Sequence, residues 1–272
     1  MESYNEIYGI LEKIKEKKPL IHHITNYVTA NDCANIVLAM GGSPIMADDP
    51  NEVVEMVSIA SALVLNTGTL NGRTIDSFII AGKRANALNI PVVLDPVGVG
   101  ATNLRNSTVE KIVREVSLSV IRGNMSEIKN IYGINSLTKG VDSIDNTLDG
   151  GQEIATSLAK KLNCVVAITG AVDIISNGKK TFFIKNGHEI LSNITGTGCM
   201  SSSLIGLCCG AGENTLYGAI AGIMIMGISG ENAKNRLKES EGLGSFKVYL
   251  MDAVSKFSKD DIKERGKLYE IL

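Results

Sequence analysis

The segment 193–200 contains the residue types of an anion-binding turn. Gly196 and Gly198 come directly before an apolar, helix-competent segment. Glycines let the backbone turn so that N–H groups point inward at the start of a helix, where negative charge is favoured. Thr197 is a candidate N-cap, and its hydroxyl would add a donor. A developing phosphoryl charge fits such a site, although an ordinary strand-to-helix turn would also contain these glycines.

Cys199 lies in the same turn, and its position allows two interpretations. A thiol at a helix N-terminus can have a lowered pKa and act as a nucleophile or a weak base. A buried cysteine is more often inert packing. No third residue that would orient a Cys–His pair is recognisable, so both interpretations stay open. Cys208 and Cys209 occupy an apolar helical segment and are expected to pack in the core.

Polar or glycine-rich residues follow five predicted strands. In open parallel sheets, ligands bind outside the carboxyl ends of the strands. These ends should therefore meet at one edge and form one site. The five groups are Asn66, Thr67 and Gly68; Asp95 and Pro96; Arg122, Gly123 and Asn124 with Glu127; Thr169 and Gly170; and 195–199.

Two carboxylates in this set, Asp95 and Glu127, are the best candidate metal ligands in the chain. Mg²⁺ takes few protein ligands and keeps several waters, so two carboxylates at neighbouring strand ends suit it. Asp95 could instead be a turn residue, and Glu127 a solvated acid that complements a helix dipole. Arg122 could clamp a phosphate or form a surface ion pair. Thr169 could donate to a nucleotide phosphate or be an ordinary strand-end hydroxyl.

Other polar or polarisable residues carry weaker signals. His22 and His23 end a predicted strand, and at least one of them is expected to be structural or to contact substrate. His188 follows an exposed turn and is assigned no role. Met46 could line an apolar pocket, although methionine is more often part of a core.

Hydrophobic periodicity predicts alternating strands and helices that would position these residues. The expected helices cover 4–17, 31–40, 52–57, 73–88, 105–116, 125–132, 153–162, 200–209, 215–228 and, at the surface, 245–257 and 260–272. The expected strands cover 19–26, 61–65, 91–96, 116–121 and 164–170, with a hairpin of 173–176 and 181–184 around Asn177-Gly178. Residues 135–151 are expected to form a surface loop.

This alternation predicts an α/β fold with a mostly parallel central sheet and helices on both faces. No linker divides the chain, so residues 1–272 are expected to form one domain. The predicted strands are continuous apolar runs, which are typical of strands buried on both faces.

The composition excludes several classes of protein. With 272 residues and a formal charge of −2, the chain has no basic surplus to neutralise nucleic-acid phosphates. Five scattered cysteines without a C-x-x-C pair indicate neither a disulfide framework nor a zinc site, and they fit a reducing cytoplasm. The N-terminal segment 1–18 lacks the apolar core of a signal peptide. The apolar stretch 219–228 is too short to span a bilayer.

Five separated motifs resemble those of the hydroxyethylthiazole kinase family, the thiamine-salvage member of the ribokinase-like superfamily. The similarity covers residues 10–265 in the family's order. The motifs are PLIHHITNYV at 19–28, GSPIM at 42–46, LDPVGVGAT at 94–102, IRGNMSE at 121–127 and TGTGC at 195–199.

The resemblance implies a ribokinase-like three-layer sandwich that phosphorylates the primary hydroxyl of 4-methyl-5-(2-hydroxyethyl)thiazole with ATP and Mg²⁺. It implies a homotrimer in the cytoplasm, with thiazole pockets between subunits and neither a nucleic-acid nor a membrane partner. Glu127, in the N-x-x-E signature 124–127, would act on Mg²⁺ through water, and Asp95 would share the metal. The implied ATP contacts are Arg122, Thr169 and Asn124, and the implied substrate contacts are Met46, Gly196, Asn26, Val28 and Gly68.

Cys199 marks a departure from the wider superfamily. Most ribokinase-like enzymes have an aspartate base at this position, whereas the family that this chain resembles has a cysteine there. A thiol is a poorer base than a carboxylate. Phosphoryl transfer depends mainly on positioning and charge stabilisation, so a weak base beside an anion hole of Gly196, Thr197, Gly198 and Cys199 is expected to suffice. Three alternatives remain: a related kinase for a hydroxymethylpyrimidine or a sugar, a non-catalytic binding protein on the same scaffold, and a cysteine-dependent acyl transferase.

Overall fold

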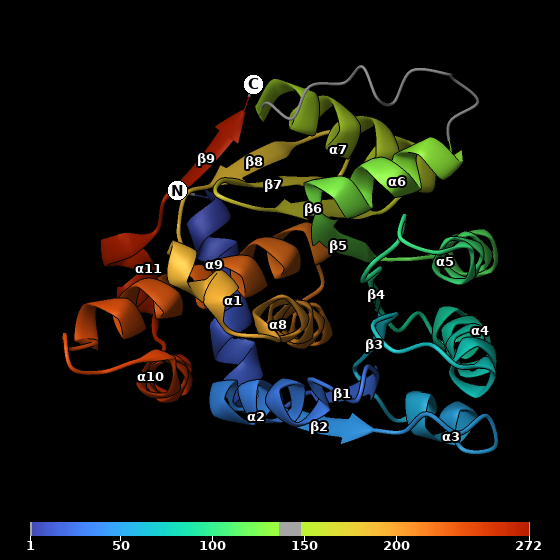
Figure 1. Cartoon of the computed structure of the whole chain (residues 1–272), viewed down its shortest axis with the longest axis horizontal. Helices are drawn as coiled ribbons and strands as arrows, with labels where there is room; N and C mark the ends of the chain where they lie inside the picture. Colours follow the sequence, from blue (N-terminus) through green and yellow to red (C-terminus); the bar gives the residue numbers. More distant parts are fainter. Residues whose placement is uncertain (1, 136–147, 272) are drawn as a thin grey trace.

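The central element of the computed structural model, which describes residues 2–135 and 148–271, is a mixed β-sheet (Figure 1). Within the described residues its strand order is β2-β1-β3-β4-β5-β6-β7-β8-β9. Strands β1 to β6 are parallel, whereas β7, β8 and β9 are antiparallel to their neighbours. The strands are β1 (Leu20–Ile24), β2 (Ser43–Met46), β3 (Ala62–Asn66), β4 (Val92–Asp95), β5 (Val120–Asn124), β6 (Val165–Thr169), β7 (Asp173–Ser176), β8 (Thr181–Ile184) and β9 (Leu268–Ile271).

Helices cover both faces of the sheet, which gives three layers (Figure 1). One face carries α1 (Glu2–Lys17), α2 (Ala30–Met40), α8 (Thr197–Ala211), α9 (Thr215–Arg236), α10 (Leu243–Ser255) and α11 (Lys259–Arg265). The other face carries α3 (Val53–Ser58), α4 (Gly72–Ala87), α5 (Asn103–Glu115), α6 (Met125–Asn135) and α7 (Leu148–Leu162). Each face has its own hydrophobic core, so the sheet separates two clusters of buried side chains.

The strand β3 shows why continuous apolar runs form the middle of this sheet. All five of its residues are buried. Successive side chains point to opposite faces of a strand. Ala62 and Val64 accordingly pack in one core, and Leu63 and Leu65 pack in the other. The expected sheet with helices on both faces is confirmed.

Small residues hold α8 deep in the molecule. A Cβ at Gly206 would meet a side-chain methyl of Val64 at 2.5 Å, and one at Gly222 of α9 would meet the backbone of Ile205 at 2.6 Å. Only glycine permits these approaches, so α8 lies tightly between the sheet and α9. Its N-terminus is thereby held at the carboxyl ends of β3 and β4. Although α9 is long and apolar, no helix within 2–135 and 148–271 could cross a membrane.

The hairpin around Asn177-Gly178 is confirmed. Ser176 pairs with Thr181 across the turn, and Gly178 has a φ of 83°, in the left-handed region that favours glycine. The Asn177 side chain accepts the backbone N–H groups of Lys179 and Lys180, which fixes the turn.

Several boundaries predicted from the sequence are wrong; helix α9, for example, ends at Arg236 and not at residue 228. Strand β5 begins at Val120, after the start of the predicted 116–121, and it includes Arg122 to Asn124. Helix α7 begins at Leu148, inside the predicted loop 135–151; the part of that loop from 136 to 147 lies outside the described residues. The predicted helix 260–272 ends at Arg265, and β9 follows it. Pairing with β9 satisfies the edge of β8, an advantage that local periodicity cannot reveal.

Candidate active site

Four of the five predicted strand ends meet at one edge of the sheet. Asn66 and Asp95 are direct register partners at the ends of β3 and β4. Asn124 and Thr169 are register partners at the ends of β5 and β6. The fifth group does not follow a strand, because a 3₁₀ helix, η2 (Glu189–Asn193), precedes the glycine turn.

Asp95 is buried at the centre of this edge, with 1% of its surface exposed. Its Oδ2 accepts hydrogen bonds from Asn66 Nδ2 at 3.0 Å and from Ser202 Oγ at 2.8 Å. Arg122 Nη1 lies 3.8 Å from the same oxygen. Burial raises the pKa of this carboxyl, against the lowering effect of Arg122. Its other oxygen, Oδ1, is buried and finds no hydrogen-bond partner within the described part of the chain.

Glu127 is fixed by a reciprocal cap at the start of α6. Its Oε2 accepts the N–H of Asn124 at 2.9 Å, while its own N–H donates to Asn124 Oδ1 at 2.9 Å. Its Oε1 accepts the N–H of Gly98 at 3.0 Å, which ties α6 to the loop after β4. The Glu127 charge also contributes to the raised pKa of Asp95, so the two carboxylates interact.

Asp95 and Glu127 fit a magnesium ion that is held through few protein ligands and water. The unpartnered Oδ1 of Asp95 is a buried acceptor that a cation or its bound water would satisfy. Residues 2–135 and 148–271 contain no group of three or more His, Cys, Asp or Glu side chains placed to hold a metal. Mg²⁺ takes one or two carboxylates plus waters and substrate phosphates.

The side chain of Arg122, on β5, contacts both the end of β6 and the first turn of α8. Its Nη2 donates to Thr169 Oγ1 at 2.5 Å. A Cβ at Gly198 would meet Arg122 Nη1 at 2.7 Å, so only glycine lets the guanidinium lie against the start of α8. The arginine is thus part-buried in the site and pairs weakly with Asp95, rather than forming a surface ion pair.

Cys199 is part-buried, and its sulfur accepts two side-chain amide hydrogen bonds. Asn66 Nδ2 lies 3.3 Å from Sγ, and Asn26 Nδ2 lies 3.4 Å from it. Burial raises the pKa of this thiol, and the charge of Asp95 raises it further. The lowered pKa that a helix N-terminus can confer is therefore not found, and Cys199 is a protonated thiol at neutral pH.

The glycine turn leaves the start of α8 without a side-chain cap. Gly196 is the N-cap residue, with a φ of 93°. The prediction of Thr197 as N-cap is wrong, because its hydroxyl donates to the carbonyl of Leu191 at 3.0 Å. The first backbone N–H groups of a helix have no partner within the helix. They are available here to an anion beside Arg122 and Cys199.

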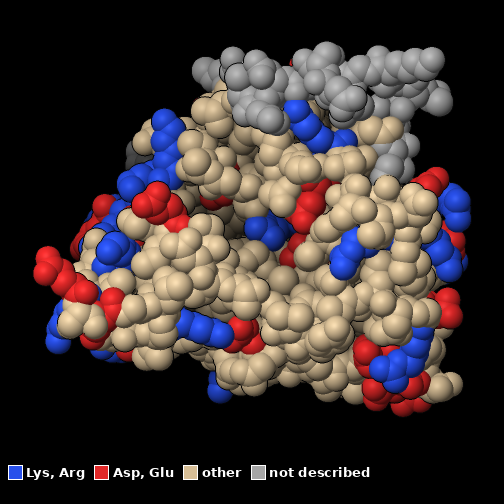
Figure 2. Space-filling view, in the orientation of Figure 1, with Lys and Arg blue, Asp and Glu red and all other residues tan. Residues whose placement is uncertain are grey.

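A pocket of about 520 Å³ opens beside this turn. It contains Arg122, Asn124 and Thr169, and Figure 2 shows the face hollowed near its centre, with basic and acidic side chains adjoining. Its lining also includes Asp173, His188, Leu191, Thr197, Gly198, Ile223 and Met226. One part of the lining is polar and cationic and another is apolar, as a nucleotide needs for its phosphates and its base.

The residues expected to contact substrate lie outside that pocket. Gly68 packs against Asn26, since a Cβ at Gly68 would meet Asn26 Cβ at 2.8 Å. Asn26 is buried beside Cys199. Val28 and Met46 are 58% and 37% exposed, so they do not line a closed cavity within one chain.

Three residues enter the site that sequence reasoning did not single out. Asn66 was only one of several polar residues at strand ends, yet it joins Asp95 to Cys199. Ser202, one turn into α8, gave no signal beyond the run of serines at 201–203. Asp173 begins β7; burial raises its pKa to about 7, although it accepts the N–H of Gly170.

The histidines separate into structural and pocket-lining residues. His22 contacts the carbonyl of Ala47 through Nε2 at 2.8 Å, and His23 contacts Ser203 Oγ at 3.1 Å. Burial lowers the pKa of His23 to about 4, so it is neutral and structural. His188 is half-buried in the pocket, and its Nδ1 accepts the N–H of Ile190.

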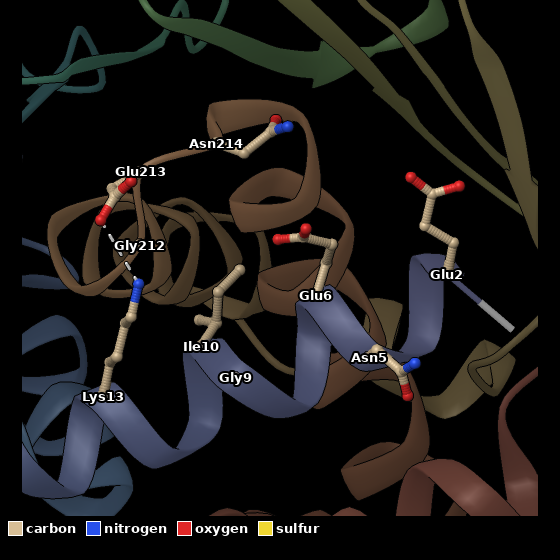
Figure 3. A pocket seen from close by; sticks show the side chains of 9 residues that line it. All are labelled: Glu2, Asn5, Glu6, Gly9, Ile10, Lys13, Gly212, Glu213 and Asn214. Carbon is tan, nitrogen blue, oxygen red and sulfur yellow. Dashed lines mark ion pairs between the residues drawn. The ribbon is translucent and has the colours of Figure 1, made fainter.

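A second pocket, of about 400 Å³, lies far from these residues. Figure 3 shows it between α1 and the turn that joins α8 to α9, with Lys13 paired to Glu213. Gly212 follows the last residue of α8, whereas Cys199 is in its first turn. This pocket is therefore separate from the carboxyl ends of the parallel strands.

The three layers and the position of the site define the ribokinase-like fold. A pyridoxal kinase from Staphylococcus aureus shares it, with a TM-score of 0.63 over 93% of this chain and 99% of that one, at 13% identity. A hydroxyethylthiazole kinase structure from Pyrococcus horikoshii OT3 is similar with a TM-score of 0.89 and 36% identity, over 98% and 99% of the two chains.

Sequence comparison assigns the family. Residues 11–260 match the hydroxyethylthiazole kinase family. The chain is 70% identical to a hydroxyethylthiazole kinase of Alkaliphilus oremlandii over the full length of both proteins. It is 45% identical to that of Methanocella arvoryzae, over 96% of each. The chain belongs to the hydroxyethylthiazole kinase family.

Proposed function

We propose that this kinase transfers the γ-phosphoryl group of ATP to the primary hydroxyl of 4-methyl-5-(2-hydroxyethyl)thiazole, in thiamine synthesis or salvage in the cytoplasm. The observation that carries the proposal is the meeting of Arg122, Thr169 and the uncapped start of α8 at one pocket. A guanidinium, a hydroxyl and free backbone N–H groups suit the oxygens of a triphosphate. Residues 1–272 would act as one kinase domain.

The nucleotide would lie in the pocket of about 520 Å³. Arg122, Thr169 and Asn124 would contact its phosphates. The apolar part of the lining, with Leu191, Ile223 and Met226, would hold the base. The terminal phosphoryl group would then lie at Gly196 to Cys199, where helix N–H groups stabilise negative charge as it develops.

Asp95 and Glu127 would hold Mg²⁺, partly through water. The ion would neutralise phosphate charge, as it does in phosphoryl transfer generally. Asp95 has one oxygen left without a partner for this purpose, and both Glu127 oxygens are held in place by backbone N–H groups. A bound cation would also favour the ionised form of Asp95, which burial disfavours.

Cys199 would lie beside the substrate hydroxyl and assist its deprotonation. Its sulfur accepts N–H groups from Asn26 and Asn66, so its own hydrogen is directed elsewhere. Because its pKa is raised, only a small fraction of the sulfur is ionised at neutral pH and able to accept the proton of the substrate hydroxyl. Positioning and charge stabilisation therefore supply most of the rate.

The thiazole would occupy the side of the site formed by Asn26, Gly68 and Gly196, with Val28 and Met46 at its rim. The exposure of these two apolar side chains, together with Tyr27 at 83%, supports an interface with another chain at this rim. The proposed oligomer is a homotrimer in which a second chain completes each pocket. Analytical ultracentrifugation of the purified chain tests the oligomer.

The direct test of the function is a purified-protein assay with ATP and the thiazole alcohol. Mass spectrometry should detect the phosphorylated alcohol and an equal amount of ADP. Pyridoxal, a hydroxymethylpyrimidine and ribose serve as competing acceptors. Phosphorylation of one of these, with the thiazole alcohol left unchanged, would refute the proposed substrate. Binding of the alcohol without ADP formation would instead indicate a non-catalytic protein.

A further inference from the structure

Arg105, on α5, forms hydrogen bonds to the loops that follow two strands of the site. Its Nη1 donates to the carbonyl of Thr67 at 2.6 Å and to that of Val97 at 2.5 Å. Its Nη2 donates to the carbonyl of Gly68 at 2.8 Å. Thr67 and Gly68 follow β3, whereas Val97 follows β4. One guanidinium thus joins the segments that carry Asn66 and Asp95.

The carbonyl of Val97 and the N–H of Gly98 belong to the same peptide unit. Arg105 binds the oxygen of this unit, and Glu127 Oε1 accepts its N–H at 3.0 Å. A peptide bonded to a cation at one end and to a carboxylate at the other is polarised, which strengthens both hydrogen bonds. The orientation of the Glu127 carboxylate therefore depends on Arg105, although the two side chains do not touch.

The loop is shaped to admit the arginine. Gly98 has a φ of 73°, and a Cβ there would meet Arg105 Cδ and Nη1 at 3.2 Å. Thr67 Oγ1 also donates to the carbonyl of Val97, at 3.1 Å. Arg105 forms no ion pair with any of the residues that the structure describes. Its guanidinium donates to backbone carbonyls instead.

We propose that Arg105 is a positioning residue of the phosphoryl-transfer site, which aligns the Val97–Gly98 peptide and, through it, the Glu127 carboxylate. The proposal rests on the function proposed above, because it gives Glu127 a role in holding Mg²⁺. A lysine at 105 has a single point of donation and cannot reach three carbonyls in the fixed geometry of a guanidinium.

The experiment compares Arg105→Met and Arg105→Lys with Arg114→Met. Arg114 is on the same helix, is exposed and pairs only with the adjacent Glu115 among the described residues, so it controls for the loss of an arginine from α5. Hydrogen exchange of segment 96–101, followed by mass spectrometry without nucleotide or metal, reports on the Gly98 N–H. We expect this segment to exchange about tenfold faster in Arg105→Met. Arg114→Met should match the wild type.

The second measurement is the Mg²⁺ concentration that gives half-maximal velocity at saturating ATP and thiazole alcohol. This concentration should rise about five- to tenfold in Arg105→Met, which is more than the rise in the KM of the thiazole alcohol. In Arg105→Lys it should lie between the values of the wild type and of Arg105→Met. A folded Arg105→Met protein with wild-type exchange in 96–101 and wild-type Mg²⁺ dependence would overturn the proposal. If Arg105→Met fails to fold, the same two results in Arg105→Lys would overturn it. The exchange measurement needs no turnover. An inactive wild-type enzyme would therefore refute the kinase function, while the exchange result would still test whether Arg105 positions the Val97–Gly98 peptide.

Discussion

The side-chain amide of Asn66 lies between Asp95 and Cys199 and donates one N–H to each, at 3.0 Å and 3.3 Å. Its carbonyl oxygen accepts the N–H of Gly68 and an N–H of Asn26, so the orientation of the amide is unambiguous. A single asparagine therefore connects the carboxylate proposed to bind the metal with the thiol proposed to face the substrate.

Replacing this asparagine by its acidic isostere tests the connection. Asn66→Asp removes both donors and places a second carboxylate about 3 Å from Asp95, where two like charges disfavour ionisation. We expect kcat to fall by at least about 100-fold and the free energy of unfolding at pH 7 to fall by about 2 kcal/mol. Asn35→Asp, on the exposed face of α2, is the matched control and should change neither quantity appreciably. Steady-state kinetics and urea denaturation provide both measurements; near-wild-type kcat would refute the role of Asn66.

Asp95 should show opposite effects on stability and activity. In Asp95→Asn, the remaining oxygen can still accept from Asn66 and Ser202, while a buried carboxyl with a raised pKa is replaced by a neutral amide. We expect the unfolding free energy at pH 8 to increase by about 1–2 kcal/mol. Turnover should fall by at least about 1,000-fold because the metal ligand is lost. Calorimetry and the ATP assay are the measurements. Retained turnover in this variant would remove Asp95 from the metal site.

Cys199→Asp should retain or raise the activity. The two amide donors at the sulfur, from Asn26 and Asn66, can serve a carboxylate equally well, and a carboxylate is the stronger base at this position. Cys199→Ala should lower kcat by about 10-fold or less, because positioning and charge stabilisation remain. Single-turnover kinetics measures the chemical step directly. An inactive Cys199→Asp protein with a native melting temperature would count against a base at residue 199.

Gly198→Ala should weaken nucleotide binding more than folding. The added Cβ would meet Arg122 Nη1 at 2.7 Å, and the flexible arginine can move away at little cost. The guanidinium would then lose its position beside Thr169, so we expect KM for ATP to rise about tenfold with less than about 1 kcal/mol change in stability. Gly9→Ala is a control within α1, where a Cβ meets nothing within 4 Å. An unchanged KM for ATP would show that Arg122 does not need this approach.

Asp173 should make the unfolding free energy depend on pH. Burial raises its pKa from 3.8 to about 7 in the folded state. Between these values the folded protein holds the proton that the unfolded chain releases. The contribution of Asp173 to the stability of the fold is thus greatest at low pH and falls as the pH rises toward 7.

The variant Asp173→Asn removes this dependence while its amide oxygen can still accept the Gly170 N–H. The measured quantity is the unfolding free energy of the variant minus that of the wild type. This difference should be about 1–3 kcal/mol more positive at pH 8 than at pH 4. Asp76→Asn, at an exposed position on α4, controls for the change in net charge. Urea denaturation at several pH values gives the comparison. A wild-type-minus-variant difference that is constant with pH would contradict the raised pKa.

The sequence by itself determined the layered α/β fold and the edge of the sheet at which the site lies. Continuous apolar runs such as 62–65 can be buried only between two layers of helices, and the carboxyl ends of parallel strands share one edge. Both follow from local pattern, so the convergence of Asn66, Asp95, Arg122 and Thr169 was predictable.

Only the tertiary structure decided the chemistry of particular side chains. Local pattern left open whether Cys199 is a thiol with a lowered pKa or inert packing, and burial next to Asp95 raises its pKa. Thr197 has the residue type of an N-cap, yet its hydroxyl donates to Leu191. The roles of Ser202 and Arg105 depend on contacts across 107 and 38 positions in the chain. Desolvation and long-range hydrogen bonds are set by which segments pack together, and periodicity along one segment carries no information about its neighbours.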